Sequence, residues 1–187
     1  LTIKGFARIE RGSDATMRLF DDVTYTYADA VVSNIDRNRY GAELSASVVI
    51  SPRFTAEAAL TVGSYRYASN PDVSLYADSD NSVIVEHAKS YMSGLHTAET
   101  PTLAAVAKLR YSTPYGWRVE LEAAYAAGRY ATPTPLRRMT RVTDLAASPE
   151  EFEAMIGQQR LDDGLAVGLS AMRSWTIRGV PSRLTAV

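Results

Sequence analysis

The sequence predicts an all-β fold, namely an antiparallel and incomplete segment of a transmembrane β-barrel with about seven strands. Three observations predict it. Apolar and polar side chains alternate in one run after another along the chain. Short turns alternate with long links between these runs, and aromatic side chains gather near the ends of the runs. Short turns are therefore expected on one rim of the sheet and long loops on the other.

The alternating runs are the primary signal. In the clearest run, which follows residue 116, the odd positions are apolar or aromatic and the even positions are mostly charged. The runs hold up to about 12 residues, and a tilted membrane strand needs about 9 to 11. The runs lie at 39–50, 54–63, 103–112, 117–125 and 165–175, with weaker strands at about 3–9 and from 183 onward.

Composition narrows the class of protein. The chain has 187 residues, 46% of them hydrophobic, which is enough for a sizeable core. Its 20 Lys and Arg are balanced by 21 Asp and Glu, and the absence of a basic stripe argues against nucleic acid as a partner. The chain has no cysteine, so it has neither a disulfide framework nor a thiolate zinc site. No apolar run reaches about 18 residues, so no membrane helix is predicted, whereas a membrane strand shows itself only by alternation.

The connections carry a second signal. Short turns are expected at Pro52, at residues 114–116 and around residues 178–181. They alternate with links of roughly 30 residues or less, which are uncommon inside compact soluble domains. Outer-membrane barrels have this asymmetry, with short periplasmic turns and long external loops.

The chemistry of the two faces separates a membrane barrel from a soluble sandwich, because alternation alone fits both. The middles of the runs hold Ala, Leu and Val, as expected for a face that contacts lipid. Aromatic residues at or near the run ends match the girdles at membrane interfaces. They are Tyr40, Phe54, Tyr111, Tyr115, Trp117, Tyr125, Tyr130 and Trp175.

Charged residues occupy the opposite face and are expected to face a watery lumen. They could bind a plug domain or line a water path, or they could pair with one another across neighbouring strands. These lumen-facing residues are Glu43, Glu57, Lys108, Arg110, Arg118, Glu120 and Glu122.

Several stretches resemble a known family. They are residues 38–44 (NRYGAEL), 51–52 (SP), 58–67 (AALTVGSYRY), 167–170 (VGLS) and 173–177 (RSWTI). Together they resemble the C-terminal barrel of TonB-dependent outer-membrane receptors of the Bacteroidota type.

The resemblance implies a 22-stranded barrel with a plug inside it. Such receptors import a scarce nutrient such as a siderophore, vitamin, peptide or glycan, energised by a TonB-type coupling protein through the N-terminal part. The chain begins without Met or a targeting signal and stops inside an alternating run. We therefore expect residues 1–187 to be part of one barrel domain, without the plug, the energy-coupling box or the terminal aromatic strand. The expected partners are outer-membrane lipid, the plug and the remaining barrel strands.

The link between residues 132 and 163 holds the candidate ligand site. Arg137, Arg138 and Arg141, with Tyr130 nearby, could clamp a carboxylate or phosphate. The alternative is that these arginines are solvated loop charges or partners of lipopolysaccharide phosphates. Ser148 begins a capping box with Pro149 and Glu151, which predicts a short helix with one apolar face, made by Phe152, Met155 and Ile156.

The link between residues 68 and 101 holds both histidines, His87 and His96, among five acidic residues. Their spacing lacks the i,i+4 pattern of a zinc helix, so no metal or cofactor is expected. Residues 78–81 lack the Gly and Glu of a calcium loop and are read as a turn. The histidines have no ordered third partner for a nearby serine, so no catalytic residue is assigned and no enzyme is predicted.

Two other functions fit parts of the sequence. A soluble or surface-displayed all-β binding module would place the same apolar residues in a closed core. A small outer-membrane barrel enzyme would depend on His87 or His96.

Overall fold

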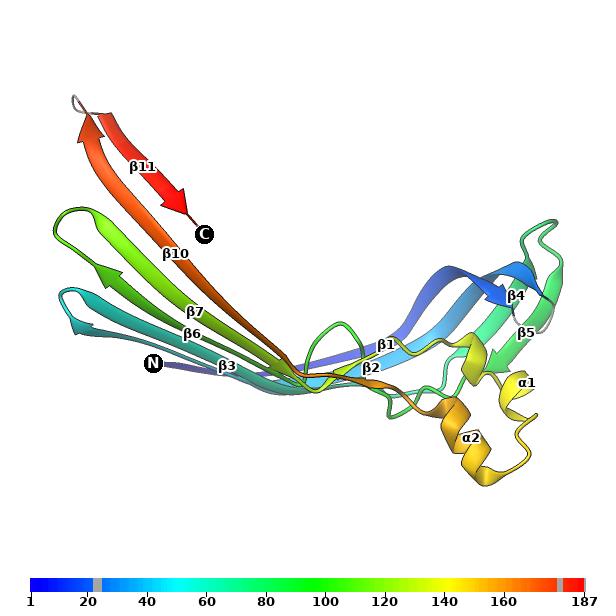
Figure 1. Cartoon of the computed structure of the whole chain (residues 1–187). Coiled ribbons are helices and arrows are strands. Elements are labelled where there is room, and N and C mark those ends of the chain that lie inside the picture. Colours follow the sequence, from blue (N-terminus) through cyan, green and yellow to red (C-terminus); the bar gives the residue numbers. More distant parts are fainter. Residues whose placement is uncertain (22–24, 178–179, 187) are drawn as a thin grey trace.

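The computed structural model describes residues 1–21, 25–177 and 180–186. They form antiparallel β-structure with three short helical segments, which confirms the predicted all-β fold. Figure 1 shows a long curved sheet with a smaller lobe at one end. In chain order the elements are β1 (Thr2–Asp21), β2 (Thr26–Ser51), β3 (Phe54–Tyr67), β4 (Asp72–Ala77), β5 (Val83–Lys89), β6 (Leu103–Ser112), β7 (Trp117–Ala127), β8 (Arg129–Tyr130), η1 (Leu136–Arg138), α1 (Thr140–Thr143), α2 (Pro149–Ile156), β9 (Arg160–Leu161), β10 (Gly164–Ile177) and β11 (Val180–Ala186).

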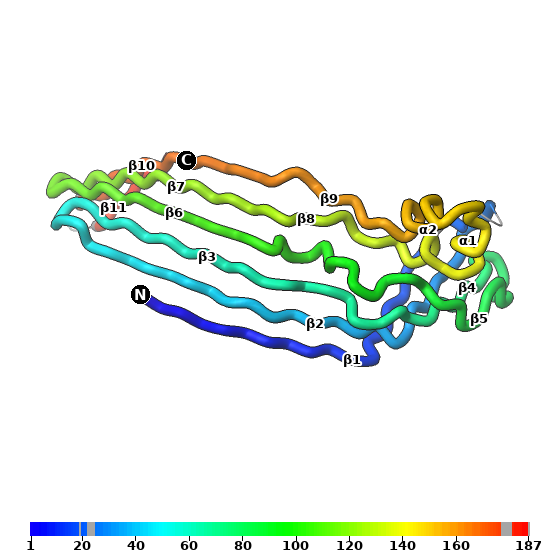
Figure 2. Tube along the Cα trace, turned by 90° about the horizontal axis from the view of Figure 1, so that it is seen from below, coloured from blue at the N-terminus to red at the C-terminus, as the bar shows by residue number. Residues whose placement is uncertain are grey.

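The main sheet has the strand order β11-β10-β7-β6-β3-β2, with β1 on the other edge of β2. Its strands lie side by side, with the turns at one end and the lobe at the other (Figure 2). The seven strands β1, β2, β3, β6, β7, β10 and β11 cover all the alternating runs of the sequence. Within the described residues the sheet is open, because β11 and β1 are its edges and do not pair with each other.

Strand register gives each face of the main sheet its character. Partners across an antiparallel pair point to the same side, so a correct register extends a face over many strands. Leu44 of β2 lies opposite Leu60 of β3, and Leu60 lies opposite Ala105 of β6. The row continues through Tyr125 of β7 to Leu165 of β10. The apolar halves of five strands therefore form one continuous surface.

The predicted turns at Pro52 and at residues 114–116 are confirmed. Gly116 has a φ of 79°, in the left-handed region that glycine adopts without strain. Its carbonyl accepts the backbone N–H of Ser174 at 2.8 Å, so this turn is tied to β10. A Cβ at Gly116 would lie 2.2 Å from the Ser174 carbonyl oxygen, which leaves no space for a side chain. The third predicted turn lies partly outside the described residues.

The long links are more ordered than the sequence predicted. The link expected between about residues 10 and 38 is a continuation of β1 and β2, which stay paired up to Asp21 and Thr26. The link after residue 68 contains the β4–β5 hairpin, and β4 pairs with residues 28–33 of β2. These elements, together with η1, α1 and α2, make up the distal lobe, so this rim carries a folded lobe instead of open loops.

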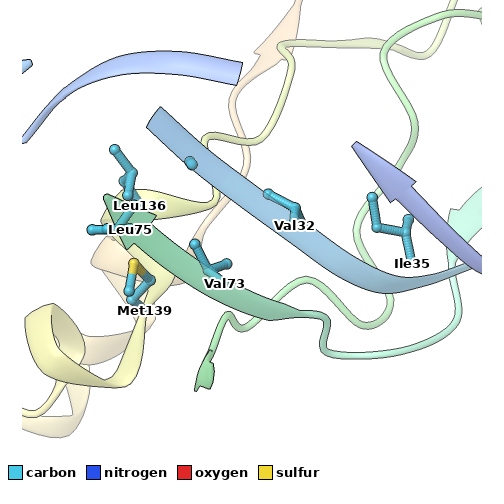
Figure 3. Packing of buried hydrophobic residues seen from close by; sticks show 7 residues of the cluster. Val32, Ile35, Val73, Leu75, Leu136 and Met139 are labelled. Atoms are coloured by element: carbon cyan, nitrogen blue, oxygen red, sulfur yellow. The ribbon is translucent and has the colours of Figure 1, made fainter. Parts of the chain in front are cut away.

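The distal lobe has its own core (Figure 3). Val32 of β2 and both Val73 and Leu75 of β4 are almost completely buried, and they pack with Leu136 and Met139 from the η1 segment. Hydrophobic burial of this kind supplies about 1.5 to 3 kcal/mol for each large side chain. The core therefore fixes the η1–α1–α2 segment on the β2–β4 surface.

The N-cap at Ser148 is confirmed, whereas the reciprocal bond of the predicted capping box goes to the residue before the N-cap. The Ser148 Oγ accepts the backbone N–H of Glu151 at 3.2 Å, with Pro149 at the first helical position of α2. The Glu151 carboxylate accepts the backbone N–H of Ala147 at 2.7 Å. The ring of Phe152 meets Tyr91 edge-on at a centroid distance of 5.3 Å, which anchors α2 to the segment after β5. Among the described residues, no helix has both the length and the apolar character needed to cross a membrane.

The lobe core gives a direct stability test. Leu75→Ala should lower the free energy of unfolding of the lobe by about 2 to 5 kcal/mol, because it leaves a cavity between β2 and η1. Leu145→Ala is the matched control, since Leu145 is 73% exposed. Denaturant unfolding followed by near-UV circular dichroism measures both. Equal loss of stability in the two variants would show that the lobe core does not depend on Leu75.

Candidate functional site

The apolar face of the main sheet is uncovered. Leu165, Val167 and Leu169 of β10 are 70%, 67% and 63% exposed, whereas Leu75 in the lobe core is 0% exposed. Exposed neighbours continue this surface across β7, β6, β3 and β2 through the paired rows. A single exposed leucine is ordinary on a protein surface, but a contiguous apolar face over neighbouring strands marks an interaction site.

Aromatic side chains border this face at both ends. At the turn end, Phe54 and Tyr111 are cross-strand partners with ring centroids 4.7 Å apart, and Trp117 begins β7. At the lobe end lie Tyr40 and Tyr125, both exposed. Ten residues separate Tyr40 from residue 50, which at about 3.3 Å per residue and a tilt of about 40° gives a band about 25 Å tall. This height matches the apolar band of outer-membrane barrels.

The opposite, polar face carries a ladder of ion pairs. Arg110 of β6 contacts Glu120 of β7 (Nε to Oε2, 3.0 Å) and Glu57 of β3 (Nη1 to Oε1, 3.6 Å). Lys108 contacts Glu122 (Nζ to Oε2, 2.6 Å) and lies 4.0 Å from Glu120 Oε1. The cross-strand pairing expected as one alternative is therefore confirmed for these five residues, which form the charge ladder.

Glu43 and Arg118 lie on the same polar face but outside the charge ladder. Neither forms an ion pair with another described residue. Their assignment to a plug contact or a water path stays a prediction. Two cations and three carboxylates make the charge ladder net negative by one charge, so its surface prefers water or a polar partner to lipid.

Two arginines at the lobe end of the polar face were missed by the sequence reasoning. Arg39 pairs with Glu99 at 2.9 Å, and Arg37 pairs with Glu10 at 3.4 Å while lying 5.5 Å from the centre of the Tyr67 ring. Four buried polar side-chain atoms of the described chain lack a hydrogen-bond partner: Arg37 Nε, Arg39 Nε, His96 Nδ1 and Thr97 Oγ1. All come from adjoining segments, since the backbone N–H of Thr97 donates to the Tyr65 carbonyl next to Arg39. These four buried atoms therefore have unused hydrogen-bonding capacity inside this end of the face.

The arginines predicted as a ligand clamp have structural contacts. Arg138 is buried and donates to the carbonyls of Ile156 (3.1 Å) and Gly157 (2.5 Å) at the end of α2, and to that of Thr134 (3.3 Å). Burial lowers the pKa of this guanidinium, while the carbonyls of a helix C-terminus favour a cation. Arg138 therefore connects η1 with α2 and is not a solvated loop charge.

The other predicted ligand residues lie at different places. Arg141 pairs with the buried Asp21 at 3.1 Å and so connects α1 with the end of β1. Tyr130 stacks on His96 with ring centroids 3.8 Å apart. Arg137 is exposed on η1. A ligand role for these four residues stays a prediction.

Gln158 connects its own segment with those of Ala131 and His96, the histidine that stacks on Tyr130. Gln158 Oε1 accepts the backbone N–H of His96 at 2.8 Å, and its Nε2 donates to the carbonyls of His96 (2.7 Å) and Ala131 (2.8 Å). Burial, with the charge of Arg66 nearby, lowers the pKa of His96, so the ring is neutral at pH 7. The sequence has no signal for these contacts, because Gln158 lies 62 residues from His96 and 27 residues from Ala131 along the chain.

The acidic side chains of the link between residues 68 and 101 bond to neighbouring residues instead of gathering in one place. Within the described residues, no group of three or more His, Asp or Glu side chains could hold an ion. Asp72 is held by Lys89 at 2.7 Å and by Asn34 at 3.0 Å, and these contacts keep its pKa below the usual value. Residues 78–81 form the β4–β5 turn as expected, with Asn81 at a φ of 56°.

The charge ladder should be measurable by a double-mutant cycle. Arg110→Gln and Glu120→Gln should show a coupling energy of about 0.2 to 1 kcal/mol, which falls in 1 M salt because both side chains are partly exposed. The measurement is urea unfolding of the chain folded in detergent micelles. Glu43→Gln with Arg118→Gln is the control cycle and should show no coupling. Equal coupling energies in both cycles would mean that the 3.0 Å contact between Arg110 and Glu120 does not contribute to stability.

The Arg138 contacts give a second test. Arg138→Ala should destabilise the α2 segment by about 2 to 3 kcal/mol, because carbonyl groups lose a charged donor. Amide hydrogen exchange of residues 149–157 measures the effect. Arg160→Ala is the control, since the one ion-pair partner of this exposed side chain among the described residues is Asp163, at 3.4 Å. Unchanged exchange in Arg138→Ala would show that α2 is held by its apolar face alone.

Comparisons of the chain with known protein families, with curated proteins and with solved structures found no match. The resemblance to TonB-dependent receptors therefore stays a prediction from residues 38–67 and 167–177. The observed chemistry of the two faces of the main sheet stands independently of it.

Proposed function

We propose that residues 1–187 are part of a barrel domain in the bacterial outer membrane, belonging to a receptor that imports a scarce nutrient. The observation that carries the proposal is the uncovered apolar face of the main sheet. Each of its large side chains would gain about 1.5 to 3 kcal/mol on leaving water. Lipid provides that environment for a whole face, with no second sheet needed to cover it.

The ends of the strands support a membrane orientation. Tight turns lie at one end of the main sheet and the folded lobe at the other, as in barrels with short periplasmic turns and larger external segments. Aromatic residues lie at both ends of the apolar band, at the level where headgroups meet the hydrocarbon. We therefore assign the lobe to the cell exterior.

The polar face supports the receptor role. In this placement the charge ladder faces the lumen. The protein partners of residues 1–187 are then the plug and the remaining barrel strands. The arginine-rich lobe end of this face, with Arg37, Arg39 and Thr97, holds unpaired buried atoms that a side-chain movement would expose to a polar nutrient such as a siderophore, vitamin, peptide or glycan. Energy would come from a TonB-type protein that acts on a part of the receptor outside these residues.

Cysteine labelling tests the membrane placement, because the chain has no cysteine of its own. Val167→Cys places a thiol on the apolar face of β10, and Ala166→Cys places one on the polar face one residue away. In lipid vesicles, the thiol at 167 should react about tenfold more slowly with a water-soluble maleimide, since the reactive thiolate needs water. Both should react equally in urea.

Equal rates in vesicles would contradict the placement. Recovery of the chain as a soluble compact monomer would instead favour the binding-module alternative, with the same face covered by protein. Import is measured as growth on one limiting nutrient, with and without a protonophore, in cells that have or lack this chain. An unchanged nutrient requirement would contradict the receptor role and leave the barrel placement intact.

A further inference from the structure

One cation lies on the apolar face near the turns. Arg173 of β10 is the cross-strand partner of Trp117 of β7, so both side chains point to the apolar side. Its guanidinium carbon lies 5.2 Å from the centre of the Trp117 ring and 6.0 Å from that of Trp175, two residues further along the strand. The two indole rings hold the guanidinium by cation–π contact.

Arg173 has no carboxylate partner in the part of the chain that the structure describes. It forms no ion pair with any described residue, and between Tyr40 and the turns the apolar face of the main sheet carries no Asp or Glu in its described strands. At the lobe end this face carries Arg66, whose Nη1 donates to the Gly94 carbonyl at 2.6 Å, and also Arg11, which donates to Asn38 and lies 3.8 Å from Asp36. Among the described strand residues, Arg173 is therefore the one cation on the turn end of this face, and it is open to an external anion.

The surroundings of Arg173 are apolar. Its partner on β11 is Leu184, which is 64% exposed, and Leu169 lies further along β10 on the same face. A soluble anion would gain one cation here and few other donors. A lipid would gain that cation and also acyl-chain contact with these leucines.

We propose that Arg173, Trp117 and Trp175 bind the phosphate of an anionic phospholipid in the leaflet on the turn side of the sheet. This inference rests on the proposed membrane placement. The planar guanidinium can donate two parallel N–H bonds to phosphate oxygens, and indole N–H groups at an interface reach the same headgroup layer. Cation–π contact with two rings restricts the guanidinium before the lipid arrives, which lowers the entropic cost of binding.

The chain provides its own sensor for the test. Trp117 and Trp175 are its two tryptophans, and both flank Arg173. The whole chain is reconstituted in mixed phosphatidylglycerol and phosphatidylcholine vesicles, with bromine on the acyl chains of one lipid or the other. At equal mole fractions, brominated phosphatidylglycerol should associate with the tryptophans about fivefold more strongly than brominated phosphatidylcholine.

Variants separate this site from a general surface charge. Arg173→Gln should abolish the preference for phosphatidylglycerol, so that both brominated lipids associate equally. Arg173→Lys should keep part of the preference. Arg183→Gln is the matched control, since Arg183 pairs with Ser174 on the opposite face and its loss removes the same charge. The control should keep the full preference.

Three results would overturn the proposal. An equal preference in wild type and Arg173→Gln, with bromine quenching still present, would refute the lipid site while leaving the membrane placement intact. Loss of the preference on adding inorganic phosphate would show a site for soluble anions. No quenching by either brominated lipid would refute the membrane placement together with the site.

Discussion

The two-residue period of the strands, fixed by their register, is the constraint on which the rest of the structure depends. A shift of one residue would send a strand's apolar side chains to the polar face. The register keeps Leu44, Leu60 and Ala105 in one row and Glu57, Lys108 and Glu122 in a row on the opposite face. Both faces are therefore continuous across strands that are distant in sequence. The main sheet then requires two different environments, one apolar and one aqueous.

The lobe uses a different principle at the far end of the same strands. β1 and β2 continue past the apolar band, and there β2 pairs with β4 on the edge that β3 occupies nearer the turns. A small core, Arg138 and Gln158 then hold segments that have little regular structure of their own. Buried backbone carbonyls need donors, and long polar side chains supply them where no strand partner exists. The lobe is thus built from individual contacts, whereas the main sheet is built from repetition.

This difference explains what could be predicted from the sequence. Apolar and polar side chains alternate without interruption in the strands of the main sheet, so strands such as 117–125 and 165–175 could be predicted from the sequence. The lobe interrupts its pattern: register shifts lie between Glu10 and Ala15, and Asn34 has a φ of 61°. In β4, Val73, Ser74 and Leu75 are all buried, so no polar face remains to show an alternation. Short local motifs such as the Ser148 N-cap remained readable, whereas the contacts of Arg138 and Gln158 depend on the tertiary fold.

The edges of the main sheet carry the final consequence of the proposed membrane placement. The outer edges of β1 and β11 have no strand partner among the described residues. In water such an edge is tolerated, because solvent satisfies its N–H and C=O groups. In hydrocarbon each unpaired group costs several kcal/mol, and only a closed sheet avoids that cost. A bilayer would therefore demand strand partners on both edges, supplied by the remaining barrel strands or, in reconstituted vesicles, by other copies of the chain, whereas a soluble sheet could leave them open. The state of these two edges, together with the cover of the apolar face, distinguishes the barrel from the soluble binding module.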